Sequence, residues 1–314
     1  MRRILPLLLA LLLTACASAD EEAHAPLPTP SVLAELPADP DGVPLLTVFV
    51  LEDNAVATMD AETYVAGVLA GEMSADWPLE ALKAQAILAR TFVLKFLSEK
   101  TSMYDGADIS TDITEAQAYN AAAVNDRILR AAAETKGQVL LTASGGLPYT
   151  WFHAHSGGKT ALAKEGLAYR DAEPAYTLVT DGLDSPDAPA EAAAWEASFS
   201  HAELLAACQK LGVKISKIGN VSIAEKGASG RALRLQIGGA KVNAAELRMA
   251  LGSKVFRSTL LTGIKLSDKS VTFRGLGYGH GVGMPQWGAY ALAQDGMAGQ
   301  DIALHYYEGL HVAS

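Results

Sequence analysis

The sequence predicts an α+β fold, in which one domain has a helical first part and a β-rich second half. Apolar residues recur at helical spacing before residue 140, whereas short alternating β-branched runs dominate after residue 220. No βα alternation runs through the chain, which disfavours a doubly wound sheet. With 50% hydrophobic and 19% charged residues among 314, the chain can bury a core, and general disorder is excluded.

The chain opens with the pattern of an export signal. Arg2 and Arg3 precede an apolar run, Ile4–Leu13, that is shorter than the roughly 20 residues of a membrane span. The run ends in LTAC, which resembles a bacterial lipobox whose cysteine, Cys16, receives lipid. We therefore expect a lipoprotein signal peptide over residues 1–15; the alternative is an ordinary signal with a chance cysteine.

A Pro/Ala-rich tether is expected over residues 16–44. Six of the 13 prolines lie there, and such a composition favours an extended spacer over a packed core. The residue after Cys16 is Ala17, not the Asp that commonly retains lipoproteins in the inner membrane. We expect the periplasmic face of the outer membrane in a diderm cell, or the outer face of the cytoplasmic membrane in a monoderm cell.

The domain itself is expected over residues 45–314. A strand is predicted at 45–51, where apolar residues alternate. Asp60 is suited to cap a helix that stops near Gly71, and Pro78 is suited to open a second helix that runs to about residue 97. A third helix is predicted over 121–135. The runs that flank Gly145-Gly146, from 138 to 152, are typical of a hairpin.

The second half is predicted to be mostly strands. Residues 172–194 are rich in Asp, Pro and Ala, which favours a surface insertion. A short helix is predicted over 244–251, closed by Gly252. The expected strands are 221–224, 232–237, 241–242 and 270–273.

Several functional classes are disfavoured. A net charge of −10 and a pI near 5.2 argue against nucleic-acid binding through phosphate neutralisation. Gly158-Lys159-Thr160 lacks the upstream glycine of a phosphate-binding loop, and the glycine-rich run 275–283 never shows Gly-x-Gly-x-x-Gly spacing. Neither Gly-x-Ser-x-Gly nor His-Glu-x-x-His occurs. Outside the lipobox the one cysteine is Cys208, expected to be a small buried residue.

Three separated blocks carry the functional signal. They are YVxGVxxxEM (64–73) with PLEALKAQA and ART (78–91), STDIT with Gln117 (110–117) and SGGKT (156–160), and GYGHGVGM with Gln286, Gly288-Ala289 and Ala293 (277–293). Each block alone would be weak, whereas the ordered set is specific. In this order the blocks resemble the SpoIID/LytB family of bacterial cell-wall proteins, and the resemblance extends from about residue 45 to residue 311.

The resemblance implies a peptidoglycan lytic transglycosylase that cuts the MurNAc–GlcNAc bond on peptide-stripped strands and leaves a 1,6-anhydro-MurNAc end. It implies Glu72 as the catalytic acid/base, and Lys83 and Arg90 match family positions. One carboxyl group suffices if it protonates the leaving oxygen and then accepts the C6 hydroxyl proton, which requires a raised pKa. A neighbouring cation would lower that pKa, so we expect Lys83 and Arg90 to bind substrate oxygens or the lactyl carboxylate.

The remaining site candidates have structural alternatives. Trp77 could stack on a sugar ring or belong to the core. The other expected substrate-binding residues include Lys159. The structural alternative is turn capping for Ser156 and Thr160, hydrogen bonding to nearby carbonyls for His280, and packing for Gln286 and Tyr290.

No cofactor is expected, although zinc stays an open question. The resemblance implies that some relatives bind zinc near the SGGxT block through His and Cys ligands. This chain has His153 and His155 there and no cysteine, and two ligands fall short of the three or four of a zinc site.

Two function classes remain. The first is a lipid-anchored enzyme whose partners are glycan strands and the membrane, with no nucleic acid. The alternative, also implied by the resemblance, is a non-catalytic glycan-binding enhancer of a cell-wall amidase. Glu72 separates them, because only the enzyme needs its carboxyl group.

Overall fold

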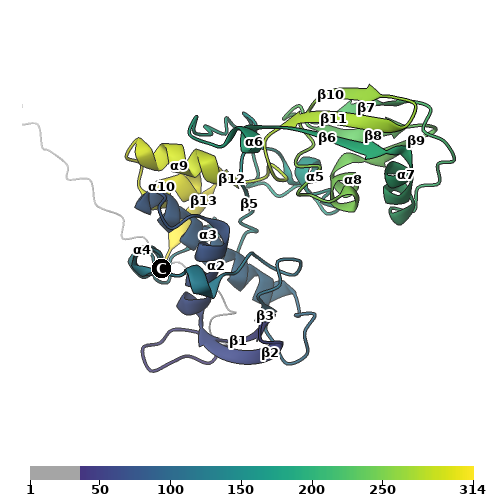
Figure 1. The fold of residues 1–314 in the computed structure, drawn as a ribbon. Coiled ribbons are helices and arrows are strands. Elements are labelled where there is room, and N and C mark those ends of the chain that lie inside the picture. The colour runs from purple at the N-terminus through teal and green to yellow at the C-terminus, as the bar shows by residue number, and fades with distance from the viewer. Residues whose placement is uncertain (1–35) are drawn as a thin grey trace, which may run out of the picture.

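The computed structural model describes residues 36–314, which form two lobes joined by several chain crossings (Figure 1). The expected signal peptide, Cys16 and most of the tether lie outside the described residues. Within the described part, no helix is both long and apolar enough to cross a bilayer. The architecture mixes helices with several small sheets and is α+β, as predicted.

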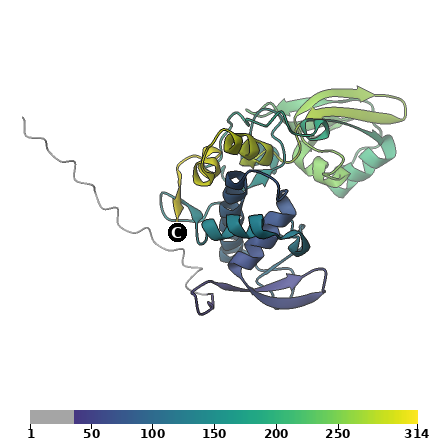
Figure 2. The ribbon, with the colours of Figure 1, turned by 60° about the vertical axis from the view of Figure 1, so that its left-hand side comes forward.

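The first lobe combines the N-terminal half of the described chain with its C-terminal end, so that purple and yellow segments lie together in both ribbon views (Figures 1 and 2). Its sheet has the order β2-β1-β3, and β4 pairs with β13. The elements are β1 (Leu45–Val50), β2 (Ala55–Asp60), α2 (Ala61–Glu72), α3 (Leu79–Glu99), β3 (Ile109–Ser110), η1 (Ala121–Ala123), α4 (Asp126–Glu134), β4 (Val139–Thr142), α9 (Gln286–Gln294), α10 (Gly299–His305) and β13 (Leu310–Ala313).

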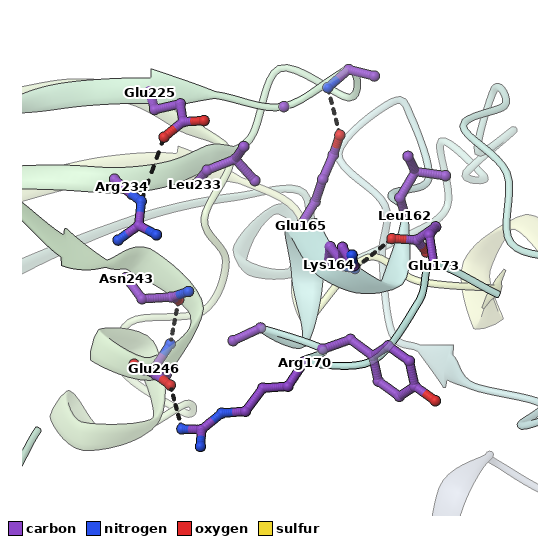
Figure 3. A pocket seen from close by; sticks show the side chains of 14 residues that line it. Leu162, Lys164, Glu165, Arg170, Glu173, Glu225, Leu233, Arg234, Asn243 and Glu246 are labelled. Atoms are coloured by element: carbon purple, nitrogen blue, oxygen red, sulfur yellow. Dashed lines mark hydrogen bonds and ion pairs between the residues drawn. The ribbon is translucent and has the colours of Figure 1, made fainter.

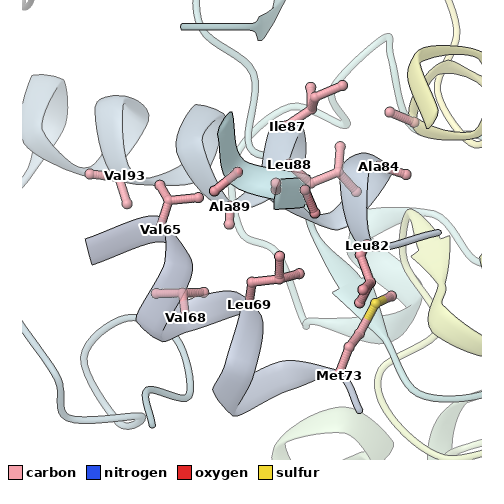
Figure 4. Packing of buried hydrophobic residues seen from close by; sticks show 14 of the residues in the cluster. Val65, Val68, Leu69, Met73, Leu82, Ala84, Ile87, Leu88, Ala89 and Val93 are labelled. Carbon is pink, nitrogen blue, oxygen red and sulfur yellow. The ribbon is translucent and has the colours of Figure 1, made fainter. Parts of the chain in front are cut away.

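Helices α2 and α3 form the centre of this lobe. The Asp60 side chain accepts a hydrogen bond from Thr63 N, which confirms the predicted cap of α2. Val65 and Leu69 of α2 point toward the α3 face that carries Leu88 and Ala89 (Figure 4). Such i, i+4 spacing places apolar side chains on one helix face, and their burial removes that face from water. The helix ends at Glu72, because Met73 has extended backbone geometry while its N–H still donates to the Leu69 carbonyl.

Two predictions in this lobe were wrong. The runs on either side of Gly145-Gly146 form no hairpin, because β4 pairs antiparallel with β13, and β5 (Phe152–His153) pairs in parallel with β12 (Met284–Pro285). The third helix begins later than expected, at Asp126, because the Asn125 side chain caps it by accepting from two backbone N–H groups. The preceding residues form only the 3₁₀ turn η1.

The second lobe has its own hydrophobic cluster. Two three-stranded sheets, β10-β11-β6 and β7-β8-β9, pack with two helices around buried residues such as Phe256, Phe273 and Leu235. The strands predicted at 221, 232, 241 and 270 are confirmed, as is the helix at 244–251. The elements are β6 (Ala194–Ser200), α7 (His201–Lys210), β7 (Val221–Lys226), β8 (Ala232–Ile237), β9 (Ala240–Asn243), α8 (Ala244–Leu251), β10 (Leu261–Leu266) and β11 (Ser270–Leu276).

The chain between the lobes carries the short elements β5, β12, α5 (Ala163–Gly166) and α6 (Ala190–Ala193) (Figure 1). The segment expected as a surface insertion, 172–194, is only partly a surface segment: fewer than half of its residues are exposed, Thr177, Ser185 and Ala192 are buried, and it is attached to the first lobe. The buried Tyr306 hydroxyl donates to the carbonyl of Gly182 at 2.9 Å. This attachment holds Asp184 against the junction of the lobes.

Candidate active site

Glu72 is the last residue of α2, and two glycines of this helix let the loop that contains Ala118 and Tyr119 pack against the helix end. A Cβ at Gly71 would lie 2.7 Å from the backbone of Ala118, and one at Gly67 would lie 2.2 Å from the Tyr119 ring. Because neither position has a side chain, the loop reaches the helix end. There Ala118 N donates to Glu72 Oε1 at 2.8 Å, which fixes the carboxyl group.

Glu72 lines a pocket of about 330 Å³ between the end of α2 and the glycine-rich segment near residue 280. Within the described chain, no other carboxyl group lines this pocket. Most of the remaining wall is aromatic, aliphatic or neutral polar. The other lining residues are Phe92, Ile113, Ala116, Gln117, Thr150, Trp151, Phe152, His153, Ala154, Tyr278, Gly279, His280 and Gln286.

The surroundings of Glu72 favour its neutral form. Burial raises the pKa of the Glu72 carboxyl group, and the hydrogen bond from Ala118 N and the nearby Gln286 amide offset only part of that rise. Its position at the C-terminus of α2 acts in the same direction, because the negative end of the helix dipole disfavours a carboxylate. A carboxyl group that keeps its proton is suited to general acid catalysis.

The glycine-rich segment forms the opposite wall through close backbone contact. His155 and Tyr278 exchange backbone hydrogen bonds of 3.0 and 2.8 Å. The fully buried Arg231 lies beneath this contact and donates to the carbonyls of Ser156 (2.6 Å) and Lys159 (2.8 Å). A Cβ at Gly281 would lie 2.4 Å from the Arg231 guanidinium, so glycine is required there.

Of the three residues predicted as substrate contacts in the SGGKT block, Ser156 and Thr160 are buried and form hydrogen bonds within the protein. Ser156 N donates to Asp184 at 2.9 Å, and the Ser156 hydroxyl donates to the same carboxylate. The Thr160 hydroxyl donates to the carbonyl of Leu178 at 2.9 Å. None of Ser156, Thr160 and the exposed Lys159 lines the pocket within the described part of the chain.

The histidines divide between two environments. His153 and His280 line the pocket with ring centroids 5.6 Å apart, and burial lowers both pKa values, that of His280 to about 3. His155 instead accepts from Gly157 N and lies 3.3 Å from Asp184. The two zinc candidates, His153 and His155, are therefore not brought together. Over residues 36–314 no three His, Cys, Asp or Glu side chains are grouped as metal ligands.

Lys83 and Arg90 do not line the pocket, and each is held by carboxylates. Lys83 pairs with Glu80 at 2.8 Å and with Glu134 at 2.5 Å. Arg90 is 4% exposed and pairs with Glu62 through Nη2 at 2.5 Å and Nε at 2.9 Å. Since neither cation lies in the pocket wall, the expected conflict with a raised Glu72 pKa does not arise.

The two residues predicted on α9 differ in placement. Gln286 lines the pocket and donates from Nε2 to the Glu72 carbonyl at 3.2 Å. Tyr290 lies outside the pocket wall, in a half-buried aromatic cluster with Trp77 and Trp287. The ring centroids in this cluster are 4.5–5.3 Å apart. The cluster is adjacent to the pocket because Trp287 follows Gln286.

A larger hollow, of about 720 Å³, lies where the second lobe meets the linking segment (Figure 3). Most of its charged side chains have ion-pair or hydrogen-bond partners. Arg170 pairs with Glu246 at 3.2 Å, and Glu165 accepts from the backbone of Ala228. Arg170 is largely exposed, and no residue predicted from the sequence lies there. The Glu72 pocket is therefore the better candidate for catalysis.

Sequence reasoning missed the residues that hold the pocket walls together. Arg231 follows Ser229-Gly230, and nothing in the sequence indicates that this arginine is buried. Asp184 lies in a segment assigned to the surface, and Glu165 accepts from the Ser229 hydroxyl. Each contact joins residues that are distant in the chain, so no local pattern could reveal it.

Two family profiles match successive parts of the chain. A family profile described as Stage II sporulation protein (SpoIID) matches residues 52–141, and a domain of unknown function, DUF8618, matches residues 161–283. The second match encloses the separate hydrophobic cluster of the second lobe.

Three relatives extend the comparison over most of the chain. An uncharacterized protein of Brachyspira hyodysenteriae is 30% identical over 82% of this chain and 67% of the relative. Stage II sporulation protein D of Bacillus amyloliquefaciens is 28% identical over 93% and 84% of the two chains. The amidase enhancer of Bacillus subtilis is 29% identical over 79% of this chain and 40% of its own length. The chain belongs to the SpoIID/LytB family.

Proposed function

We propose that this protein is a peptidoglycan lytic transglycosylase that cleaves the bond between N-acetylmuramic acid and N-acetylglucosamine. The observation that carries the proposal is the single, partly buried carboxyl group in the pocket. Ordinary glycosidases place two carboxyl groups on either side of the scissile bond. Among the residues that the structure describes, the pocket wall offers only Glu72.

One carboxyl group can complete the reaction if the substrate supplies its own nucleophile. Glu72 gives its proton to the leaving glycosidic oxygen as the bond to C1 of the muramic acid breaks. The resulting carboxylate then takes the proton of the C6 hydroxyl, whose oxygen bonds to C1 and closes the 1,6-anhydro ring. The raised pKa of Glu72 favours the first step, and the second step returns the group to its protonated form.

The surroundings of the pocket fit a glycan better than a charged ligand. Aromatic residues line one wall, and the cluster of Trp77, Trp287 and Tyr290 lies beside Gln286. Such rings favour the apolar faces of sugars. No cationic side chain of lysine or arginine lines the pocket within the described residues, so it offers no partner for stem-peptide carboxylates. This supports peptide-stripped strands as the substrate.

The test is digestion of peptide-stripped and peptide-bearing peptidoglycan by the native protein and by Glu72→Gln, with products identified by mass spectrometry. We expect 1,6-anhydro ends, lighter than hydrolytic ends by one water, from stripped strands and the native protein alone. Equal product from Glu72→Gln would refute the role of Glu72, and ordinary reducing ends would identify a hydrolase.

The alternative is a non-catalytic enhancer of a cell-wall amidase, which the relative named amidase enhancer favours. The same digests decide this point when a cell-wall amidase is added. An enhancer would release no glycan fragments alone, yet would raise amidase turnover equally as native protein and as Glu72→Gln.

We also propose that Cys16 anchors the protein by lipid on the outer side of a membrane, as the lipobox-like sequence indicates. Mass spectrometry of the mature N-terminal peptide should show a lipid-modified Cys16. Release of Cys16→Ala into the soluble exported fraction would support the proposal, and an unmodified N-terminus would contradict it.

A further inference from the structure

Two buried polar atoms in the Glu72 pocket have no hydrogen-bond partner among residues 36–314. They are Gln117 Oε1 and His153 Nε2. Buried polar groups in folded proteins are nearly always paired, so each exception requires an explanation. Other unpaired buried atoms occur at Gln85, His201, Arg231 and His311, but of these residues none lines the pocket.

The chemistry of both atoms follows from the contact that each side chain does make. Gln117 is 3% exposed, and its Nε2 donates to the Ala89 carbonyl at 3.5 Å. A carbonyl can only accept, so the amide nitrogen faces Ala89 and Oε1 is left as an acceptor. The long distance indicates that this bond orients the amide more than it stabilises the fold.

The same reasoning defines the His153 tautomer. Its Nδ1 lies 3.2 Å from the Val282 carbonyl, so Nδ1 carries the proton and donates. The side chain is 4% exposed, and its burial, together with nearby His280 and Arg231, lowers its pKa well below the usual range. The ring is therefore neutral, and Nε2 is a hydrogen-bond acceptor to which no group of the described chain donates.

The pocket thus contains two buried acceptors, Gln117 Oε1 and His153 Nε2, that no donor of the described chain satisfies, and they lie in the same wall as the Glu72 carboxyl group. An anion has no proton to donate to either acceptor. A neutral ligand that brings several N–H and O–H groups would satisfy both atoms, and an N-acetylated amino sugar carries such groups around its ring. The aromatic and aliphatic wall, which includes Trp151, fits the apolar remainder of such a ring.

We propose that Gln117 and His153 are substrate-positioning residues that accept hydrogen bonds from the acetamido N–H and hydroxyl groups of the sugar beside Glu72. The inference rests on the proposed glycan substrate, although it concerns binding and not cleavage. The two acceptors hold the sugar while Glu72 acts on the neighbouring glycosidic bond. Without a bound sugar, both acceptors stay buried and lack a hydrogen-bond partner, which is unfavourable for the folded protein.

The test uses variants that delete one acceptor and little else. Gln117→Leu replaces the amide with an apolar group of similar size. His153→Asn keeps a donor near the Val282 carbonyl and removes Nε2, whereas His153→Gln keeps an acceptor at the position of Nε2. Gln236→Leu is the matched control, because Gln236 also donates once to a backbone carbonyl but lies in the second lobe.

Calorimetric titration with an N-acetylglucosamine trimer and with peptide-stripped glycan fragments measures affinity, and thermal unfolding measures stability. We expect Gln117→Leu and His153→Asn each to weaken binding about tenfold, the value of one neutral hydrogen bond. The melting temperature of Gln117→Leu should hold or rise, because an unsatisfied buried atom is removed. His153→Gln should recover part of the affinity, and Gln236→Leu should retain all of it.

Each other result overturns the inference. Unchanged affinity in Gln117→Leu and His153→Asn would show that the sugar does not reach these atoms. Loss of stability together with affinity would make the two side chains structural. Failure of the native protein to bind either ligand would also refute it. If binding follows the expected pattern but peptidoglycan is not cleaved, the positioning role stands and the proposed transglycosylase activity fails.

Discussion

Replacing Arg90 with methionine should destabilise the protein and act on the site only through the fold. The guanidinium makes two bonds to Glu62 and a third, at 3.0 Å, to the carbonyl of Gln138, so it connects α2, α3 and the start of β4. Its side chain is 5% exposed and that of Glu62 is 19% exposed. Arg90→Met would therefore leave a carboxylate largely buried without its partner.

Removing one partner of a buried ion pair typically costs about 3–5 kcal/mol. Because Glu62 retains some contact with solvent, we expect the lower end, about 3 kcal/mol. At about 2–4 °C per kcal/mol for chains of this size, the melting temperature should fall by about 6–12 °C. Urea unfolding monitored by circular dichroism gives the free energy, and the thermal midpoint checks it.

Arg274→Met is the matched control. Arg274 pairs with Glu196, but both side chains are more than half exposed, so the loss should stay below about 1 kcal/mol. If Arg90→Met keeps native stability yet abolishes glycan cleavage, the reasoning is refuted, because Arg90 would then contact the substrate directly. Cleavage that falls only in step with the folded fraction would support it.

Three further predictions concern the pocket. The raised pKa means that folded Glu72 binds its proton more tightly than the unfolded chain does, so its contribution to stability is lost as pH rises. Glu72→Gln should therefore melt higher than native protein at pH 7, with no difference below about pH 4. Gly71→Ala places a Cβ 2.7 Å from the backbone of Ala118, so it should lower the free energy of unfolding by about 2 kcal/mol and abolish cleavage. Gly239→Ala, where a Cβ meets open space, is the control for both measurements. Asp184→Ala removes the acceptor of two Ser156 bonds and should cost about 3 kcal/mol in urea unfolding, whereas a loss under 1 kcal/mol would contradict the network.

Local sequence signals predicted the elements whose boundaries depend on local chemistry. Asp60 predicted the start of α2, the apolar alternation predicted strand β8, and Gly252 predicted the end of α8. The hairpin prediction failed because the partner of β4 is β13, at the other end of the chain. A strand's own residues carry its face pattern but not the identity of its neighbour.

The candidate site divides in the same way. The motif around Glu72 located the carboxyl group, and Gln286 and His280 do line its pocket. Lys83 was expected to contact the substrate, but it lies outside the pocket wall, and the sequence could not reveal that Glu134 pairs with it. Ion-pair partners and buried anchors depend on long-range packing, and a single sequence does not encode them in a readable local pattern.

The most direct test of the central claim is digestion of peptide-stripped glycan strands in water enriched in heavy oxygen. A transglycosylase that relies on Glu72 alone uses the C6 hydroxyl as nucleophile, so the new muramic ends should be anhydro and carry no solvent oxygen. A hydrolase would transfer one solvent oxygen to each new end. Unlabelled anhydro ends from the native protein, and none from Glu72→Gln, are the predicted result. Labelled reducing ends would contradict the proposed mechanism.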